Sequence, residues 1–315
     1  MTDNYITIDG GTSNTRIALV CNGKVTDKIR LKSGAKDADG FKKQSLKESI
    51  ENLLLRNKSA ANEIKAVLAS GMITSRGGLC EIPHISAPAG IKELHNATVR
   101  RYIPEICEIP FAFIPGVKIS SDSLEKSDIM RGEETELMGL DEDIADSLVL
   151  LPGSHSKCIS VSSDSKITDF HTYLTGEMIY AVANATILSK SVNMQCKPSA
   201  KYLKIGYEYC AEMGINEALF KTRILDTVLG ASENDCFGFF MGAVLYGEIN
   251  RVIGFPEHRI VVAGKKELKN PTAFLLREYS EKQVICIDDR LAENAPTMGM
   301  LKIYSYNQGE NILCG

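Results

Sequence analysis

A pattern of a strand, a glycine-containing turn and two further strands occurs twice in the chain. The first copy has apolar and β-branched residues at 5–8, turns at Gly10-Gly11, and continues into strands predicted at 14–20 and 24–31. The second copy has predicted strands at 148–151, 158–161 and 166–170. Residues 10–27 and 153–169 align with a difference of one residue in length. The repeat predicts two related β-β-β halves, although a chance similarity of two hairpins is the simpler alternative.

The turns of both copies carry groups that suit a polyphosphate. Asp9 ends the first strand, where a carboxylate can hold a water molecule of a magnesium ion. Backbone N–H groups and polar side chains in the two turns can donate to phosphate oxygens. The candidate donors are Gly11, Thr12, Ser13, Gly153, Ser154, His155 and Lys157. We expect the two turns to face one another across a cleft and to bind opposite sides of one polyphosphate. The competing interpretations are an ordinary hairpin turn and, for Lys157, a solvated strand end.

The remaining pattern predicts an α/β protein with mixed sheets. In the first half, Leu46, Ile50 and Leu53 have helical spacing, and a buried strand follows at 64–70. The second half predicts a helical region that starts with Thr175 as N-cap, an apolar helix at 237–252 with glycines for close approach to the sheet, and strands at 259–263 and 283–287. Asn270-Pro271 is expected to begin a helix between these two strands.

The charged segment 141–146 separates two apolar blocks, and we interpret it as the boundary and hinge between domains 1–145 and 146–315. Gly264 follows the buried strand at 259–263, where a backbone without a side chain could pass close to an adenine. A plain turn glycine is an equally good interpretation of that position.

Charge and motifs exclude several classes of function. The net charge is −4, the pI is about 5.8 and there is no basic run, which argues against nucleic acid or a membrane as partner. No stretch of 18 uncharged apolar residues and no leader pattern is present, so a cytoplasmic location is expected. The nine cysteines are scattered, which predicts reduced thiols. Neither the P-loop motif nor the dinucleotide-binding glycine motif occurs.

The order of these features resembles the actin-like ATPase superfamily, which includes hexokinase. Within it, four segments resemble the 2-dehydro-3-deoxygalactonokinase family: 9–16, 130–137, 151–157 and 169–177. The resemblance implies two duplicated actin-like (ribonuclease H-like) domains around an interdomain cleft. It places the substrate and the first phosphate turn in the N-terminal domain, and the second turn and the adenosine site in the C-terminal domain. It also implies ATP and Mg²⁺, and transfer of the γ-phosphoryl group to the 6-hydroxyl of a 2-keto-3-deoxy sugar acid in galactonate catabolism.

Such a transfer needs a carboxylate to take the hydroxyl proton and groups that hold the sugar acid. Glu133 or Glu134, at a sheet-to-helix junction, is the predicted base, with Glu133 slightly preferred. Acids in a first helical turn are also favoured by the helix dipole alone. Arg131 is predicted to bind the substrate carboxylate, with a surface ion pair as the alternative, and Gly71 and Met72 are further candidate substrate contacts.

Two positions depart from the family pattern, and they leave the acceptor open. Gly10 and Cys158 stand where family members carry tryptophan, and the chain has no tryptophan. One alternative is a kinase of the same fold that acts on another small acceptor such as pantothenate. Another is a nucleotide-binding regulatory protein that transfers no phosphate. A homodimer is compatible with the sequence.

Overall fold

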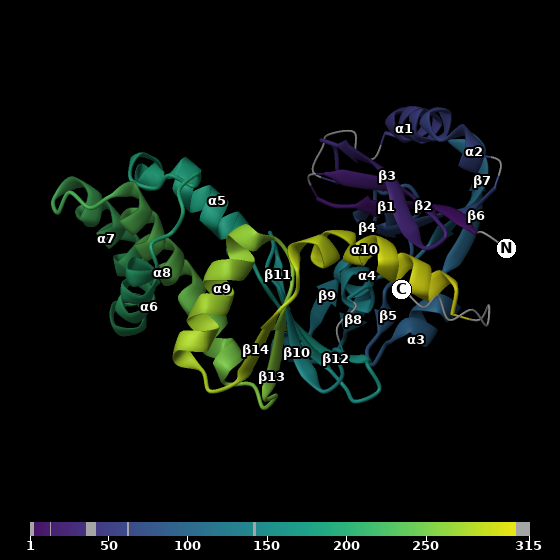
Figure 1. Ribbon diagram of the computed structural model, residues 1–315. Coiled ribbons are helices and arrows are strands. Elements are labelled where there is room, and N and C mark those ends of the chain that lie inside the picture. The colour runs from purple at the N-terminus through teal and green to yellow at the C-terminus, as the bar shows by residue number, and fades with distance from the viewer. Residues whose placement is uncertain (1–2, 13, 36–41, 62, 141–142, 307–315) are drawn as a thin grey trace. The chain divides into compact units, whose positions relative to one another are not determined.

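The computed structural model describes residues 3–12, 14–35, 42–61, 63–140 and 143–306, which form two compact units (Figure 1). The first unit contains the residues up to Ala145, the segment Ser162–Asp169 and the described residues from Arg290 onward. The second contains Asp146–Val161 and Phe170–Asp289. Residues 162–169 and 290–306 therefore group with the first unit, whereas the sequence placed them in the second domain. The predicted hinge includes residues 141 and 142, which lie outside the described residues.

The first unit is built on a six-stranded mixed sheet with the order β3-β2-β1-β4-β7-β6. Its strands are β1 (Asn4–Gly10), β2 (Thr15–Cys21), β3 (Lys24–Leu31), β4 (Ile64–Gly71), β6 (Val99–Ile103) and β7 (Cys107–Phe113). β1, β2 and β3 are antiparallel neighbours, whereas β4 runs parallel to both β1 and β7. The register pairs Gly10 with Gly71, so that β1 and β4 end side by side.

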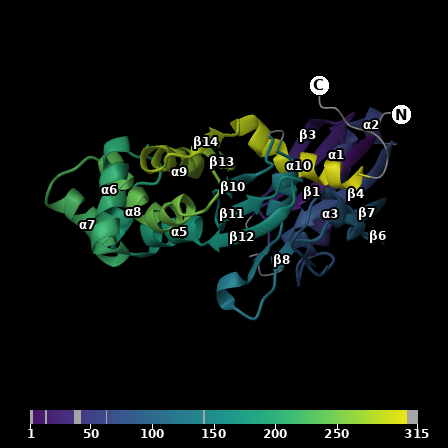
Figure 2. The same ribbon diagram turned by 90° about the horizontal axis from the view of Figure 1, so that it is seen from below.

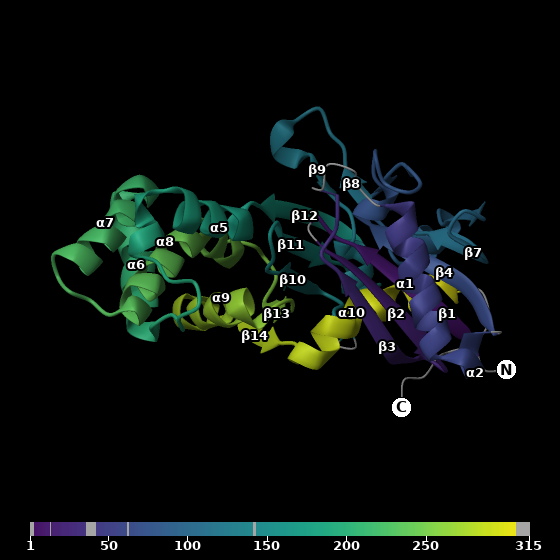
Figure 3. The same ribbon diagram turned by 90° about the horizontal axis from the view of Figure 1, so that it is seen from above.

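Helices cover both faces of this sheet. α1 (Lys43–Arg56) packs its apolar side chains into the same core as Ile6. On the other face, the Thr7 hydroxyl lies 3.1 Å from the Thr297 hydroxyl on α10 (Asp289–Tyr304). Figures 1 and 3 show α1 and α10 on opposite sides of the strands. This contact explains why the end of the chain belongs to the first unit.

α10 also packs against the short helix α4 (Glu133–Met138) with backbone touching backbone. A Cβ added at Gly139 would lie 1.7 Å from the Ala295 carbonyl oxygen, and one added at Gly299 would lie 1.8 Å from the Thr135 carbonyl oxygen. Only glycine permits such an approach, so these two positions fix how α4 rests on α10.

Smaller elements complete the first unit. β5 (Ile85–Ser86), β8 (Val117–Ile119) and β9 (Asp128–Met130) form a three-stranded sheet in that order. The short helices are α2 (Lys58–Ala61), η1 (Met72–Thr74), α3 (Ile91–Asn96) and η2 (Leu124–Lys126). Ala89 pairs with Ile167, which agrees with the grouping of the segment Ser162–Asp169 with the first unit.

The second unit repeats the central topology of the first. Its sheet has the order β12-β11-β10-β13-β14, which matches β3-β2-β1-β4-β7 in both succession and direction where the pairs are described. The strands are β10 (Ser147–Leu151), β11 (Ser156–Val161), β12 (Ile167–Tyr173), β13 (Arg259–Val262) and β14 (Gln283–Cys286). The first three residues of β12, 167–169, group with the first unit although the strand belongs to this sheet. The duplicated α/β arrangement with mixed sheets is therefore confirmed.

The helices of the second unit lie in two layers. α5 (Thr175–Ala185), α8 (Glu233–Ile253) and α9 (Lys266–Tyr279) pack against the face that carries Leu148 and Leu150, and α6 (Ala200–Met213) and α7 (Ile215–Thr227) lie beyond α8 (Figure 2). The short helix η3 (Ile187–Lys190) follows α5. α8 is long and apolar enough to span a membrane by composition, but 72% of its most apolar window is buried inside the fold, as in a core helix.

Three local predictions in this unit are wrong. Thr175 is the first residue of α5, whose N-cap is Leu174, and its hydroxyl donates to Glu248 rather than accepting a helix N–H as an N-cap would. α9 begins at Lys266, so Pro271 lies inside the helix, where its missing N–H costs a single hydrogen bond. Gly242 approaches the backbone of α6 and not the sheet, since an added Cβ would lie 2.0 Å from the Leu203 carbonyl oxygen.

Candidate active site

Three glycines join the strand ends of the first unit to the start of α4. A Cβ on Gly71, whose φ is +81°, would lie 2.6 Å from the Gly10 carbonyl oxygen. A Cβ on Gly132, whose φ is +111°, would lie 3.3 Å from the Gly71 Cα. Both glycines have left-handed backbone, which residues with a Cβ adopt at a cost. The chain segments that carry Asp9, Gly71 and Glu133 are therefore brought together by close glycine contacts, and the Ser70 and Thr135 hydroxyls, 3.1 Å apart, also join the end of β4 to α4.

Asp9 is the carboxylate at the end of β1. Its side chain is 18% exposed and one oxygen lies 3.6 Å from Arg16 Nε. Burial raises the pKa of the Asp9 carboxyl, and the charge of Arg16 works in the opposite direction. Among the described residues, no three His, Cys, Asp or Glu side chains are grouped to hold a metal ion. A single carboxylate fits Mg²⁺ that keeps water and phosphate oxygens as its other ligands.

The first turn is only partly available for phosphate. The Gly11 N–H donates to the Asn14 carbonyl at 2.9 Å, so this predicted phosphate donor closes the turn. Thr12 is half-buried beside Gly34, where an added Cβ would lie 2.7 Å from the Thr12 carbonyl oxygen. Ser13 lies outside the described residues. Thr12 therefore remains the described candidate donor in this turn.

The two acids at the start of α4 have different environments. Both carboxylate oxygens of Glu134 lie 2.8 Å from the Gly132 N–H, and the side chain is fully buried. Burial, followed by the nearby Glu133 charge, raises the pKa of Glu134 to about 8. Glu133 is partly exposed, and its Oε2 accepts the Arg131 N–H at 3.0 Å. Glu133 is therefore the more accessible of the two candidate bases.

Arg131 uses its guanidinium inside the protein. Nη1 donates to the carbonyl oxygen of Thr74 at 2.8 Å and also to its hydroxyl, and Nη2 donates to the Ile82 carbonyl at 2.9 Å and to His84 Nδ1 at 3.2 Å. These bonds hold the segment that follows Met72, the half-buried first residue of η1. A two-pronged bond from this guanidinium to a substrate carboxylate would require some of these contacts to break.

The second turn rests on the amino-terminal end of α5. The Gly176 N–H donates to the Gly153 carbonyl at 3.1 Å, and the Glu177 N–H donates to the Ser154 carbonyl at 3.2 Å. A Cβ at Gly176 would lie 2.4 Å from the Gly153 carbonyl oxygen. His155 Nε2 lies 3.4 Å from a Glu177 carboxylate oxygen. Because its carbonyls face the helix, the turn is fixed in place by the backbone of α5.

Lys157 and Gly264 adjoin this turn in the second unit. Lys157 is only 4% exposed, and its Nζ donates to the Thr172 hydroxyl at 2.9 Å. The alternative interpretation of Lys157 as a solvated residue at a strand end is therefore wrong. Gly264 has a φ of +86°, and an added Cβ would lie 2.9 Å from the Pro152 carbonyl oxygen. The end of β13 therefore contacts the loop that follows β10. The expectation that the turns of both units bind one nucleotide stays a prediction.

A comparison with protein families decides the identity. The model of the 2-keto-3-deoxy-galactonokinase family matches residues 9–302. The chain belongs to this family. It is therefore a kinase, as the resemblance of segments 9–16, 130–137, 151–157 and 169–177 predicted.

Individual relatives of the kinase agree with this assignment. It is 25% identical over 251 residues to the 2-dehydro-3-deoxygalactonokinase of Escherichia coli K12, covering 78% of this chain and 79% of that one. It is 30% identical over 193 residues to a probable 2-dehydro-3-deoxygalactonokinase of Rhizobium meliloti, covering 60% of this chain and 59% of that one.

Solved structures confirm the fold of the kinase. A crystal structure described as a putative 2-dehydro-3-deoxygalactonokinase from Sinorhizobium meliloti superposes with a TM-score of 0.79 at 24% identity, covering 97% of this chain and all of that one. The activator of the 2-hydroxyisocaproyl-CoA dehydratase from Clostridium difficile superposes with a TM-score of 0.51 at 10% identity, covering 98% and 95%. The expected actin-like ATPase fold is thereby confirmed.

The sequence interpretation missed two residues beside the site of the kinase. Glu248 on α8 is buried, and it accepts a hydrogen bond from the Thr175 hydroxyl at the start of α5. The sequence does offer one signal for Glu248, because it is an acidic residue within the largely apolar segment that forms α8. His84 was missed because only the folded loop brings it to Arg131.

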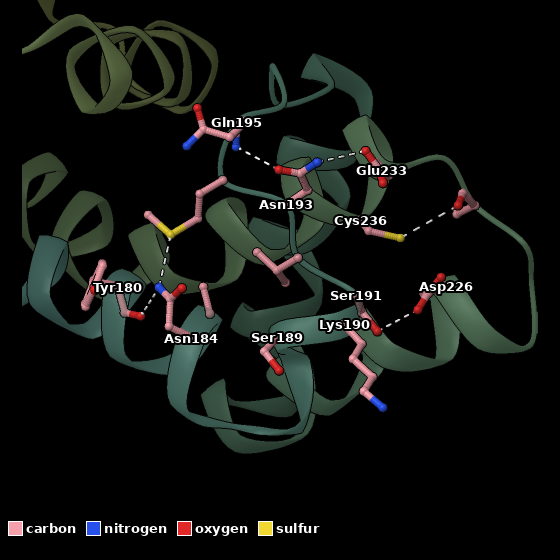
Figure 4. Close-up of a pocket in the computed structure, with 14 residues that line it drawn as sticks. Tyr180, Asn184, Ser189, Lys190, Ser191, Asn193, Gln195, Asp226, Glu233 and Cys236 are labelled. Atoms are coloured by element: carbon pink, nitrogen blue, oxygen red, sulfur yellow. Dashed lines mark hydrogen bonds between the residues drawn. The ribbon is translucent and has the colours of Figure 1, made fainter.

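A separate pocket of the kinase lies among α5, η3 and α8, with a volume of about 570 Å³ (Figure 4). Its polar side chains bond mainly to one another: Ser191 donates to Asp226 at 2.6 Å and Asn193 donates to Glu233 at 3.0 Å. None of the predicted site residues lines it. The pocket is therefore distinct from the region of the phosphate turns.

Proposed function

We propose that the kinase transfers the γ-phosphoryl group of ATP to the 6-hydroxyl of 2-keto-3-deoxy-galactonate. The observation that carries the proposal is the family match over 9–302, in a chain whose first unit joins Asp9, Gly71 and Glu133 through glycine backbone. The first unit therefore supplies two carboxylates: Asp9 for the metal ion that binds the phosphates, and Glu133 for the proton of the acceptor hydroxyl.

Phosphoryl transfer depends on positioning and on neutralising charge more than on covalent chemistry by the protein. Mg²⁺ bound to ATP would supply positive charge to the phosphate oxygens, and Asp9 would orient its water ligands. Thr12 and the second turn at 153–157 would donate hydrogen bonds to the phosphates, and Gly264 would lie against the adenine. Gly71 and Met72 would contact the sugar acid.

Glu133 is the proposed base that takes the proton of the 6-hydroxyl. Its carboxylate is partly exposed and accepts a hydrogen bond from the Arg131 N–H. The raised pKa of Glu134, about 8, leaves that carboxyl mostly protonated at neutral pH, and its burial keeps it from a substrate. A base must be ionised and within reach of the proton it removes. Glu134 is therefore assigned to hold the turn at Gly132.

The alternative functions have less support. Neither pantothenate phosphorylation nor a regulatory role without transfer agrees with the family match. We propose that the enzyme is cytoplasmic and acts on small molecules, without nucleic acid or a membrane as partner. The predicted homodimer is open to measurement by light scattering of the purified protein.

An acceptor panel tests the proposal. The purified protein is incubated with ATP, Mg²⁺ and single acceptors: 2-keto-3-deoxy-galactonate, 2-keto-3-deoxy-gluconate, galactonate and pantothenate. ADP release is followed, and the product is analysed by phosphorus NMR. We expect release with 2-keto-3-deoxy-galactonate, little without an acceptor, and a 6-phosphate product. Equal release with and without every acceptor would refute the proposed transfer.

A further inference from the structure

We propose that His84 and Lys118, together with the charge of Arg131, bind the carboxylate of the sugar acid. This proposal rests on the proposed function, since it names the groups that recognise the acid end of that substrate. It replaces a direct two-pronged bond from Arg131 with a donor that Arg131 holds in place.

The guanidinium of Arg131 forms no hydrogen bond to a carboxylate within the described residues, so its positive charge is not neutralised by an ion pair. Its four guanidinium bonds within the described residues go to neutral acceptors on Thr74, Ile82 and His84. The carboxyl groups of Glu134 and Glu81 are near, but neither is hydrogen-bonded to this guanidinium in the part of the chain that the structure describes. A half-buried cation that binds only neutral groups leaves a positive field around it.

Arg131 also fixes the orientation of the His84 proton. A guanidinium has only donors, so the His84 Nδ1 that lies 3.2 Å from Arg131 Nη2 must accept, and the ring proton is on Nε2. Burial, with the charges of Arg131 and Lys118, lowers the pKa of His84 to about 4. The imidazole is therefore neutral at physiological pH and presents Nε2–H, which has no hydrogen-bond partner among the described residues.

The position of this donor suits the substrate of the proposed reaction. His84 immediately precedes β5, and its ring lies over Gly116, where an added Cβ would be 2.7 Å from the ring Cδ2. Arg131 leads directly into Gly132 and Glu133, and β5, β8, β9 and α4 lie close together in the first unit (Figure 1). Lys118 on β8 pairs with Ser86, two residues after His84, and adds a second positive charge near the ring. A neutral N–H in a positive field favours an anionic oxygen over a neutral one.

Two substitutions of His84 separate its two nitrogens. In His84→Asn the amide oxygen can replace Nδ1 as acceptor for Arg131, while the Nε2–H donor is lost. In His84→Gln an amide N–H can reach the place of Nε2, while the acceptor for Arg131 is lost. Lys118→Gln removes the second charge, and Lys24→Gln, at an exposed position on β3, is the matched control.

Steady-state kinetics of these variants with 2-keto-3-deoxy-galactonate and with its methyl ester test the proposal. We expect His84→Asn and Lys118→Gln to raise KM for the acid about ten- to hundredfold, with KM for ATP unchanged. The preference of the wild type for the acid over the ester should fall in these two variants and persist in His84→Gln and Lys24→Gln. Thermal unfolding of each variant verifies folding.

The outcomes separate this proposal from the proposed function. If the wild type phosphorylates the acid but His84→Asn and Lys118→Gln keep its KM and its preference over the ester, the carboxylate site is refuted and the function stands. If the wild type phosphorylates no keto-deoxy acid, the function fails and the assignment of these residues fails with it.

Discussion

The Thr175 hydroxyl donates a hydrogen bond to the Glu248 carboxylate in the interior of the second unit. Thr175 is the first residue of α5, whose next two N–H groups hold the carbonyls of Gly153 and Ser154. The Ser156 hydroxyl also stabilises this carboxylate, whose pKa is raised by burial. Glu248 thus connects Ser156, at the second phosphate turn, with Thr175, at the start of α5.

We therefore expect Thr175→Val to disturb nucleotide binding. The substitution keeps the shape of the side chain but removes one of the two hydroxyl groups that stabilise the buried Glu248, which costs about 1–3 kcal/mol of the free energy of unfolding. KM for ATP should rise about three- to tenfold, while KM for the sugar acid stays constant. Urea denaturation and steady-state kinetics measure the two effects. Thr175→Ser, which retains the hydroxyl, is the control, and wild-type values in Thr175→Val would contradict the role.

The two acids of α4 should respond differently to the same substitution. Glu133→Gln removes the proposed base and should lower kcat by about two to four orders of magnitude, with KM for ATP unchanged. Glu134→Gln replaces a mostly protonated carboxyl by an amide whose oxygen can still accept the Gly132 N–H, so kcat should stay within about threefold. Parallel ADP-release assays at pH 7 decide the matter. A larger loss in Glu134→Gln than in Glu133→Gln would reverse the assignment.

Glu134 also predicts how stability depends on pH. Its pKa rises from 4.5 in the unfolded chain to about 8 in the folded protein. The folded state therefore binds more protons between these values, and the contribution of Glu134 to stability falls as pH rises from about 4.5 to 8 and is constant above that. The limiting slope is about 1.4 kcal/mol per pH unit.

Urea denaturation at pH 5.5, 6.5 and 7.5 measures this slope. Because Asp9 and Glu248 also have raised pKa values, the informative quantity is the difference between wild type and Glu134→Gln. The variant should gain stability relative to the wild type as pH increases. A difference that does not change with pH would show that Glu134 is ionised in the folded protein.

Glycine contacts predict opposite effects for the same substitution at two sites. Gly139→Ala places a Cβ 1.7 Å from the Ala295 carbonyl oxygen, so α4 and α10 must separate, at a cost of about 3 kcal/mol or more. Gly247→Ala, on the exposed side of α8, has nothing within 4 Å and should stabilise by about 0.5–1 kcal/mol. Thermal and urea unfolding of both variants test the pair. Similar stabilities for the two would contradict the close packing of α4 on α10.

The sequence was sufficient where local pattern determines structure. Apolar alternation located β1 and β3, and the repeat of the first hairpin at 153–169 predicted that the two sheets share one topology. The acids at 133 and 134 were correctly placed in the first turn of a helix. These features depend on neighbours within a few residues, which a single sequence displays.

The sequence was insufficient where distant segments meet. Nothing in the periodicity of 289–304 shows that this helix covers the sheet of the first unit. The hydrogen bonds of the Arg131 guanidinium depend on carbonyls of the loop at 74–82, and the buried Lys157 donates to Thr172 on β12, a strand further along the chain. Such contacts are set by tertiary packing, which propensity and spacing do not encode.

The return of the chain to its first unit affects how the protein is made. A ribosome adds about 5–20 residues per second, and domains that are complete fold as they emerge. The strands near Thr7 are synthesised first, yet the α10 residue Thr297 that covers them is among the last of the described residues to appear. The second unit can mature during translation, whereas the first must keep one face of its sheet uncovered until α10 has been synthesised. That nascent surface is where a chaperone would be needed.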